Sequence, residues 1–263
     1  MTTDQNHYPS IRHVIMLLLL LILAFAVYFS LTGILLNMPG YTIKDSDLSA
    51  VYMVSALILL PFIVYVKKRT DIPGNFSLNF PAIRIMGVLA VLVITLKIIA
   101  TPFFYSELHF KALNEGNLMI NSFDLREPEA STVFKFLHFV ILAPIFEEVF
   151  FRGQIQTLMM KRYSPAKAII LTSVFFAILH LKPDNLVALF VCGLIFGMVY
   201  YRTQSLGAAV FLHFSYNLLD FFSVYKTIIA MDQMFLLNFL AFLLSIVVMS
   251  GILIYLGTNP VES

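Results

Sequence analysis

The chain has 263 residues, of which 60% are apolar and 12% are charged, and its mean hydropathy is +0.89. A soluble domain has roughly 45 to 50% apolar and about 25% charged residues, so this composition excludes a soluble protein and predicts an all-α membrane protein. The 17 Lys and Arg residues nearly balance the 15 Asp and Glu residues, which leaves nucleic acid without support as a partner. Cys192 is the only cysteine, so no intrachain disulfide can form.

Apolar runs that can cross a membrane follow one another along the chain. A hydrocarbon core of about 30 Å needs ~17 to 25 helical residues, and we find about eight such runs. They are residues 14–36, 50–66, 83–104, 132–151, 166–181, 186–201, 206–222 and 235–256. The first is too long for the apolar part of a cleaved signal peptide, so we expect it to remain as a span.

Basic residues gather in alternate connections between these runs. In the second, fourth and sixth connections they are Lys67, Lys68, Arg69, Arg84, Lys161, Arg162, Lys167 and Arg202. The other connections are poorer in basic charge. Because basic loops stay in the cytoplasm, the pattern predicts an integral protein of the plasma membrane with both termini cytoplasmic.

The longest polar stretch, residues 106–130, is the expected boundary within the chain. We expect an N-terminal membrane region with three helices at residues 1–130 and a core of four helices at residues 131–223. A C-terminal transmembrane helix is expected in residues 224–263. Lys97 is an exception within the three plain N-terminal spans, and its long side chain is expected to reach towards the nearer membrane surface.

The fourth run holds three ionisable residues within six positions, in the sequence Pro-Ile-Phe-Glu-Glu-Val-Phe-Phe-Arg-Gly. Each costs at least ~2.5 to 3.5 kcal/mol at mid-membrane, so it is seldom present without a partner or a function. Glu148 and Arg152 are four residues apart and can pair on one helix face. Glu147 points about 100° away from Glu148, so Arg152 does not pair with it on this helix face. The alternative is a structural charge cluster near a helix end.

Two later runs each supply a histidine. Phe176 and His180 share a face at the end of the fifth run, and His213 and Asn217 share a face in the seventh. Taken singly, each histidine is also explained by a helix contact or by a position at the membrane surface.

Hairpin geometry predicts that these residues meet. Glu147 and His180 are equally far from the turn between the fourth and fifth runs, so they should lie level, each roughly 24 Å from that turn. Gly197 and His213 are related in the same way by the next hairpin. Gly193 and Gly197 form a G-x-x-x-G pattern, and we expect this small face where the seventh run presents its histidine.

Glu147, His180, His213 and Asn217 are therefore expected to converge in a pocket within the bilayer. Glu147 can act as general base on a water positioned by His180, while His213 and Asn217 donate to a developing oxyanion. The same glutamate and histidines can instead hold zinc with a water in the fourth position. Asn217 suits an oxyanion better than zinc, and His213 has no acid within one turn, so hydrolysis that requires no cofactor is favoured.

The order of Glu-Glu-x-x-x-Arg, Phe-x-x-x-His, a glycine-spaced helix and His-x-x-x-Asn resembles the CPBP or Abi family. This family includes type II CAAX prenyl endopeptidases, lysostaphin-resistance-like proteins and bacteriocin-processing or self-immunity proteins. The resemblance covers about residues 143–217. It implies an intramembrane endopeptidase, described either as a metalloprotease or as a glutamate protease without metal, with a membrane-associated peptide or protein as substrate.

The resemblance also assigns roles. It makes Glu147 the catalytic glutamate, and the remaining motif positions are Glu148, Arg152, His180, His213 and Asn217. The family often has Thr-Gly-Ser before its last motif helix, where this chain has Thr-Gln-Ser at residues 203–205.

Three other readings stay open. A transporter or proton relay would also place Glu and His within the membrane, although no repeat relates two halves of this chain. A non-catalytic immunity or scaffold protein would keep the motifs as a binding pocket. A nucleophilic enzyme has less support, because Ser173 and Ser215 lack a clear triad and Cys192 lacks an activating partner.

Overall fold

The computed structural model describes residues 10–70, 78–115, 129–221 and 235–258, and every regular element within these ranges is a helix. The all-α prediction is therefore confirmed. The α-helices and the 3-10 or π segments between them are α1 (Ile11–Leu36), α2 (Asp45–Ser55), η1 (Ala56–Ile58), α3 (Leu59–Arg69), α4 (Ile83–Glu115), α5 (Glu129–Phe136), η2 (Leu137–Leu142), α6 (Ala143–Glu148), η3 (Val149–Gln156), α7 (Thr157–Met160), α8 (Pro165–Leu179), η4 (Pro183–Asn185), α9 (Leu186–Thr203), α10 (Leu206–Phe221) and α12 (Phe235–Thr258).

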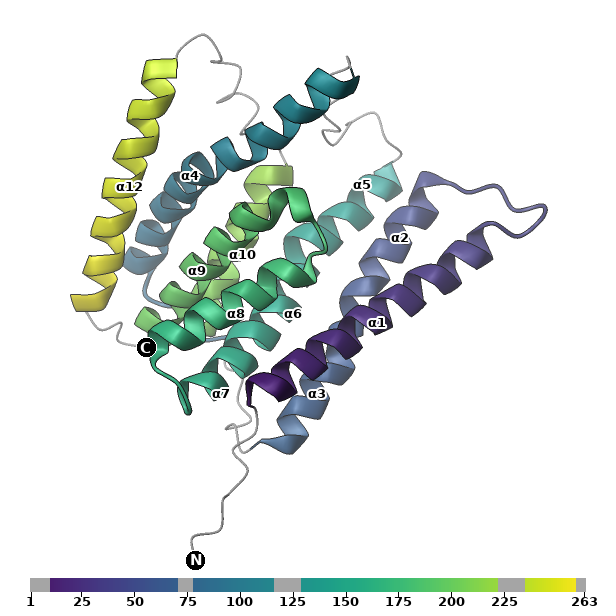
Figure 1. The fold of residues 1–263 in the computed structure, drawn as a ribbon, viewed down its shortest axis with the longest axis horizontal. Helices are drawn as coiled ribbons and strands as arrows, with labels where there is room; N and C mark the ends of the chain where they lie inside the picture. Colours follow the sequence, from purple (N-terminus) through teal and green to yellow (C-terminus); the bar gives the residue numbers. More distant parts are fainter. Residues whose placement is uncertain (1–9, 71–77, 116–128, 222–234, 259–263) are drawn as a thin grey trace, which may run out of the picture.

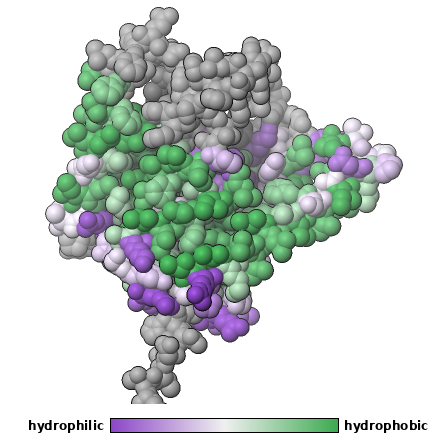
Figure 2. Space-filling view, viewed as in Figure 1, coloured by the Kyte–Doolittle hydropathy of each residue, from purple (hydrophilic) through white to green (hydrophobic). Residues whose placement is uncertain are grey.

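The helices form an apolar bundle. α6, α8, α9 and α10 lie in its middle, with α1 to α3 on one side and α4 and α12 on the other (Figure 1). Apolar residues cover most of the face drawn in Figure 2, and hydrophilic residues gather towards its lower end. Leu19, Ile34 and Val247 are each more than 60% exposed. A helical bundle with this outer surface is an integral membrane protein.

Five helical stretches are long and apolar enough to cross a membrane: Ile11–Leu36, Ser46–Arg69, Ile83–Ala100, Leu186–Thr203 and Phe239–Thr258. The expected total of about eight is not confirmed. The fourth run is divided among α5, η2, α6 and η3, while α8 and α10 have only 15 and 16 residues. These helices are short because a proline opens α8 and Gln204, in the left-handed region at φ 48°, ends α9 just before α10.

The expected polar boundary at residues 106–130 begins inside a helix. α4 continues to Glu115, because residues 106–115 are rich in Glu, Leu, Lys and Ala, which are good helix formers. Residues 116–128 lie outside the described part of the chain, and α5 begins at Glu129.

Lys97 on α4 does not reach towards a membrane surface as expected. Its side chain is 7% exposed and forms an ion pair with Asp220 on α10. Its Nζ lies 3.5 Å from the centroid of the Tyr216 ring, also on α10. An acid and an aromatic face inside the bundle thus satisfy the ammonium group and join α4 to α10.

The G-x-x-x-G face of α9 contacts α8 and η3, and not α10 as expected. A Cβ added at Gly193 would lie 3.1 Å from the Cα of Ser173, and one at Gly197 would lie 2.8 Å from Oε1 of Gln156. The carbonyl of Gly197 accepts a hydrogen bond from Nε2 of Gln156 at 2.9 Å. The glycines let η3 approach closely enough for its polar side chains to reach the backbone of α9.

Candidate active site

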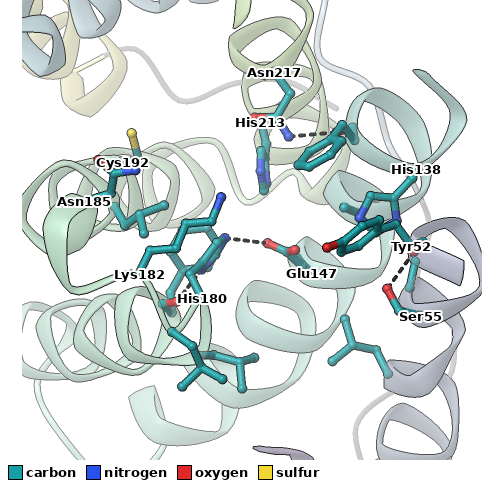
Figure 3. Close-up of a pocket in the computed structure, with 18 of the residues that line it drawn as sticks. Tyr52, Ser55, His138, Glu147, His180, Lys182, Asn185, Cys192, His213 and Asn217 are labelled. Carbon is teal, nitrogen blue, oxygen red and sulfur yellow. Dashed lines mark hydrogen bonds and ion pairs between the residues drawn. The ribbon is translucent and has the colours of Figure 1, made fainter. Parts of the chain in front are cut away.

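A partly open cavity of about 550 Å³ lies among α1, α2, η1, α3, η2, α6, α8, η4, α9 and α10. Much of its wall is apolar, including Phe25 and Phe29 of α1, Leu59 of α3 and Phe196 of α9. Figure 3 shows the polar and ionisable part of the lining. The labelled residues are Tyr52, Ser55, His138, Glu147, His180, Lys182, Asn185, Cys192, His213 and Asn217, and Tyr216 and Asp220 also line the cavity.

Glu147 and His180 meet at the cavity wall, as the hairpin geometry predicts. Oε2 of Glu147 lies 3.7 Å from Nε2 of His180, and both side chains are partly exposed (19% and 24%). Nδ1 of His180 bonds to the carbonyl oxygen of Phe176 at 2.7 Å. Because only an N–H can bond to a carbonyl, Nδ1 carries the hydrogen, and in the neutral ring Nε2 presents a lone pair towards Glu147.

Glu148 turns away from the cavity and is completely buried. Its Oε1 accepts a hydrogen bond from Nη1 of Arg152 at 2.9 Å, and Nδ1 of His213 lies 2.8 Å from the same oxygen. The expected pair of Glu148 and Arg152 is therefore present. His213 on the facing helix α10 joins this pair, because Glu148 also fixes its orientation.

Arg152 is only 1% exposed, and both of its terminal nitrogens have partners, while its buried Nε has none among the described residues. Its Nη2 donates to the carbonyl oxygen of Gly193 at 2.9 Å. The guanidinium carbon lies 4.7 Å from the ring centroid of Phe176 and 5.6 Å from that of Phe196. A guanidinium between a carboxylate, a carbonyl and aromatic faces is a stable buried cation, so Arg152 positions Glu148 and does not face the cavity.

Asn217 lines the cavity one turn beyond His213. Its Nδ2 donates to the carbonyl oxygen of Phe139 in η2 at 2.8 Å. That carbonyl is open to a side chain because Pro144, five residues further on, has no N–H, and the N–H of Ala143 bonds to the carbonyl of His138. The second N–H of the amide is left for another acceptor.

The cavity residues that were not predicted from the sequence include Tyr52 and Ser55 on α2, and His138 on η2. His138 is nine residues before Glu147, which on a regular helix puts the two on opposite faces. The π-helical turns of η2 between them rotate less per residue, so both side chains line one cavity. The ionisable His138 within an apolar run was the available signal.

The candidate metal ligands are Glu147, His180 and His213. Within the described residues, no group of three or more His, Cys, Asp and Glu is arranged to hold a metal ion. One argument against zinc is nevertheless wrong, because His213 does have an acid behind it, supplied by Glu148 from another helix. The described residues therefore do not fit a zinc ion, which normally takes at least three protein ligands.

The structure gives no support to a serine or cysteine nucleophile among the residues it describes. Ser173 is fully buried, and its Oγ donates to the carbonyl of Ile169 at 2.7 Å. Cys192 lines the cavity but is only 4% exposed. Neither is presented to the cavity together with a base.

These contacts define a helical membrane protein with a glutamate, histidines and an amide around an internal cavity. The family described as type II CAAX prenyl endopeptidase Rce1-like has a model that matches residues 129–219. This segment, which runs from α5 into α10, belongs to that family, and the resemblance read from the motifs is confirmed. The match supports the general class of a CAAX-type intramembrane endopeptidase. Searches of curated proteins and of solved structures gave no match.

Proposed function

We propose that the protein is an intramembrane endopeptidase that hydrolyses a peptide bond of a membrane-associated protein or peptide, with water activated by Glu147 and His180. The observation that carries the proposal is the approach of Oε2 of Glu147 to Nε2 of His180, 3.7 Å apart at the cavity wall. Oε2 is buried and has no hydrogen-bond partner among the described residues, and the proposal assigns the substrate water to it. The family match supports this chemistry over a transporter.

The reaction follows general-base catalysis. Glu147 takes a proton from water while Nε2 of His180 accepts the other water hydrogen and fixes its direction. The water oxygen adds to the peptide carbonyl, and the C–N bond breaks as Glu147 passes its proton to the leaving nitrogen. Asn217 can donate its second N–H to the oxyanion. His213, whose Nδ1 contacts Glu148, can donate from Nε2 only in the form of the ring that carries a hydrogen on both nitrogens.

Glu148 and Arg152 serve as positioning residues. Glu148 has no exposed surface and binds both Arg152 and His213, so it cannot reach a substrate. Together the two residues fix α6 and η3 against α9 and α10, which sets the direction in which Glu147 points.

We further propose that the protein lies in the plasma membrane with both termini in the cytoplasm. The start of α1 and the ends of α3, α7 and α12 lie at one end of the bundle (Figure 1). Lys67, Lys68 and Arg69 are in the last turn of α3, and Lys161 directly follows α7. Basic residues at this end support a cytoplasmic location for it.

The test is a comparison of membrane peptides from cells carrying the parent protein and Glu147→Gln. Glutamine is nearly isosteric but cannot take the proton, so a general base worth ~10² to 10⁴-fold is lost while the protein stays folded. A membrane peptide whose length differs between the two strains identifies the substrate. Glu107→Gln, outside the matched segment, is the control and should leave that peptide unchanged. Full cleavage by both Glu147→Gln and Glu148→Gln would exclude the enzyme.

A further inference from the structure

Three histidines line the cavity, and their Nδ1 atoms have different surroundings. Nδ1 of His180 contacts the carbonyl oxygen of Phe176, and Nδ1 of His213 contacts a carboxylate oxygen of Glu148. Each acceptor holds the ring hydrogen on Nδ1. In their neutral forms, both rings therefore present a lone pair at Nε2 and cannot donate a hydrogen bond from that atom.

His138 has the opposite arrangement. Its Nδ1 is buried and has no hydrogen-bond partner among the described residues. The ring packs against Phe139, with centroids 4.9 Å apart, and against Tyr52, with centroids 6.3 Å apart. A buried N–H without an acceptor is rarer than an unpaired acceptor, so the hydrogen of the neutral ring belongs on Nε2. Since Nε2 is not among the buried unpaired atoms and the ring lines the cavity, it offers an N–H there.

His138 lies next to the residue whose carbonyl Asn217 contacts at the cavity wall. Asn217 donates to the carbonyl of Phe139, the residue next to His138, so the hydrogen bond joins the two cavity residues through one stretch of backbone. In Figure 3, Glu147 lies between His180 on one side and His138 on the other. A peptide attacked by a water between Glu147 and His180 would thus have its carbonyl oxygen on the side of His138 and Asn217.

We propose that His138 is a further catalytic residue, which donates Nε2–H to the oxyanion beside Asn217. The proposal rests on the proposed endopeptidase function. Water adds its oxygen to the carbonyl carbon and gives a proton to Glu147, and the carbonyl oxygen becomes an oxyanion held by His138. As the carbonyl reforms, the C–N bond breaks and the nitrogen takes the proton from Glu147. His138 keeps its own proton throughout.

The hydrogen position is tested first, without any substrate. Nitrogen NMR on the full chain labelled with ¹⁵N-histidine separates the two neutral tautomers, and the six histidines are assigned by single His→Gln variants. We expect the hydrogen on Nε2 in His138 and on Nδ1 in His180 and His213. A hydrogen on Nδ1 of His138 would overturn the proposal, whatever the protein cleaves.

The role is tested by kinetics on a quenched fluorescent peptide that carries the cleavage sequence found in the Glu147→Gln comparison. His138→Phe keeps a ring but removes the donor, so kcat should fall ~10² to 10³-fold, the usual loss for one oxyanion donor. KM should stay within about threefold, because the bond forms only in the transition state. His138→Gln supplies an amide N–H and should recover part of the loss.

His13→Phe is the matched control, because His13 lies near the start of α1 and bonds to Ser10. It should leave kcat unchanged. Equal losses in His138→Phe and His138→Gln, or a change confined to KM, would show a structural role and refute the proposal. If the parent protein cleaves nothing, the endopeptidase function itself fails, and the role of His138 with it, even where the NMR result agrees.

Discussion

Removing Arg152 should destabilise the protein strongly, and Arg152→Met tests this. The guanidinium is 1% exposed and makes two charge-assisted hydrogen bonds, one to Glu148 and one to the carbonyl of Gly193. Met fills much of the same space but leaves Glu148, which has no exposed surface, without its cation. Breaking a buried ion pair from one side costs about 3 to 5 kcal/mol, and we expect a loss in this range in the free energy of unfolding.

The double variant separates charge from packing. Arg152→Met combined with Glu148→Leu removes both charges, so it should recover much of the stability lost in Arg152→Met. It should stay inactive, because His213 loses the carboxylate that orients it. Reversible unfolding in mixed detergent micelles measures all variants, with exposed Lys161→Met as a control expected within about 0.5 kcal/mol of the parent. A loss below about 1 kcal/mol in Arg152→Met would refute the reasoning.

Two further predictions concern topology and metal. In a Cys192→Ala background, single cysteines that replace Lys68 or Lys161 should react with an impermeant reagent only after the cells are opened. We expect this because both positions belong to the basic end of the bundle. Labelling of either cysteine from outside intact cells would show the opposite orientation. The purified protein should contain well under one zinc per chain and keep cleaving after exhaustive chelation, because the described residues form no cluster of three ligands. Stoichiometric zinc whose removal stops cleavage, and whose return restores it, would contradict this.

The contact between Glu147 and His180 could be predicted because it depends mainly on how far each residue is from the turn between their helices. Two straight helices joined by a tight turn place residues at equal distances from the turn side by side, and the structure ends α7 at Met160 and begins α8 at Pro165. The contacts of these two helices with the rest of the bundle are not needed for this prediction. Spacing within one hairpin predicts the level of a residue but not the neighbour that it faces, because the same argument placed the face of Gly193 and Gly197 against α10 in the next hairpin, where it does not lie.

Contacts between other helices could not be predicted in the same way. Glu148 meets His213 only because α6 packs against α10, and a helix sequence alone does not say which neighbour each face receives. The same limit explains why the face of Gly193 and Gly197 was expected against α10 but contacts α8 and η3. Lys97 was expected at a membrane surface because Asp220, 123 residues later in the sequence, could not be placed beside it.

Irregular helix geometry accounts for the remaining difference, and it shapes the site. In η2 the N–H of Ala143 bonds to the carbonyl of His138, and Pro144 has no N–H, so the carbonyl of Phe139 is left to accept the hydrogen bond from Asn217. The same wide turns place His138 in the cavity with Glu147, although ideal helical spacing would separate them. The π-helical segment before Glu147 thus has two effects, since it joins η2 to α10 and adds a third histidine to the cavity wall. Periodicity of 3.6 residues cannot reveal either effect, because both arise where that periodicity fails.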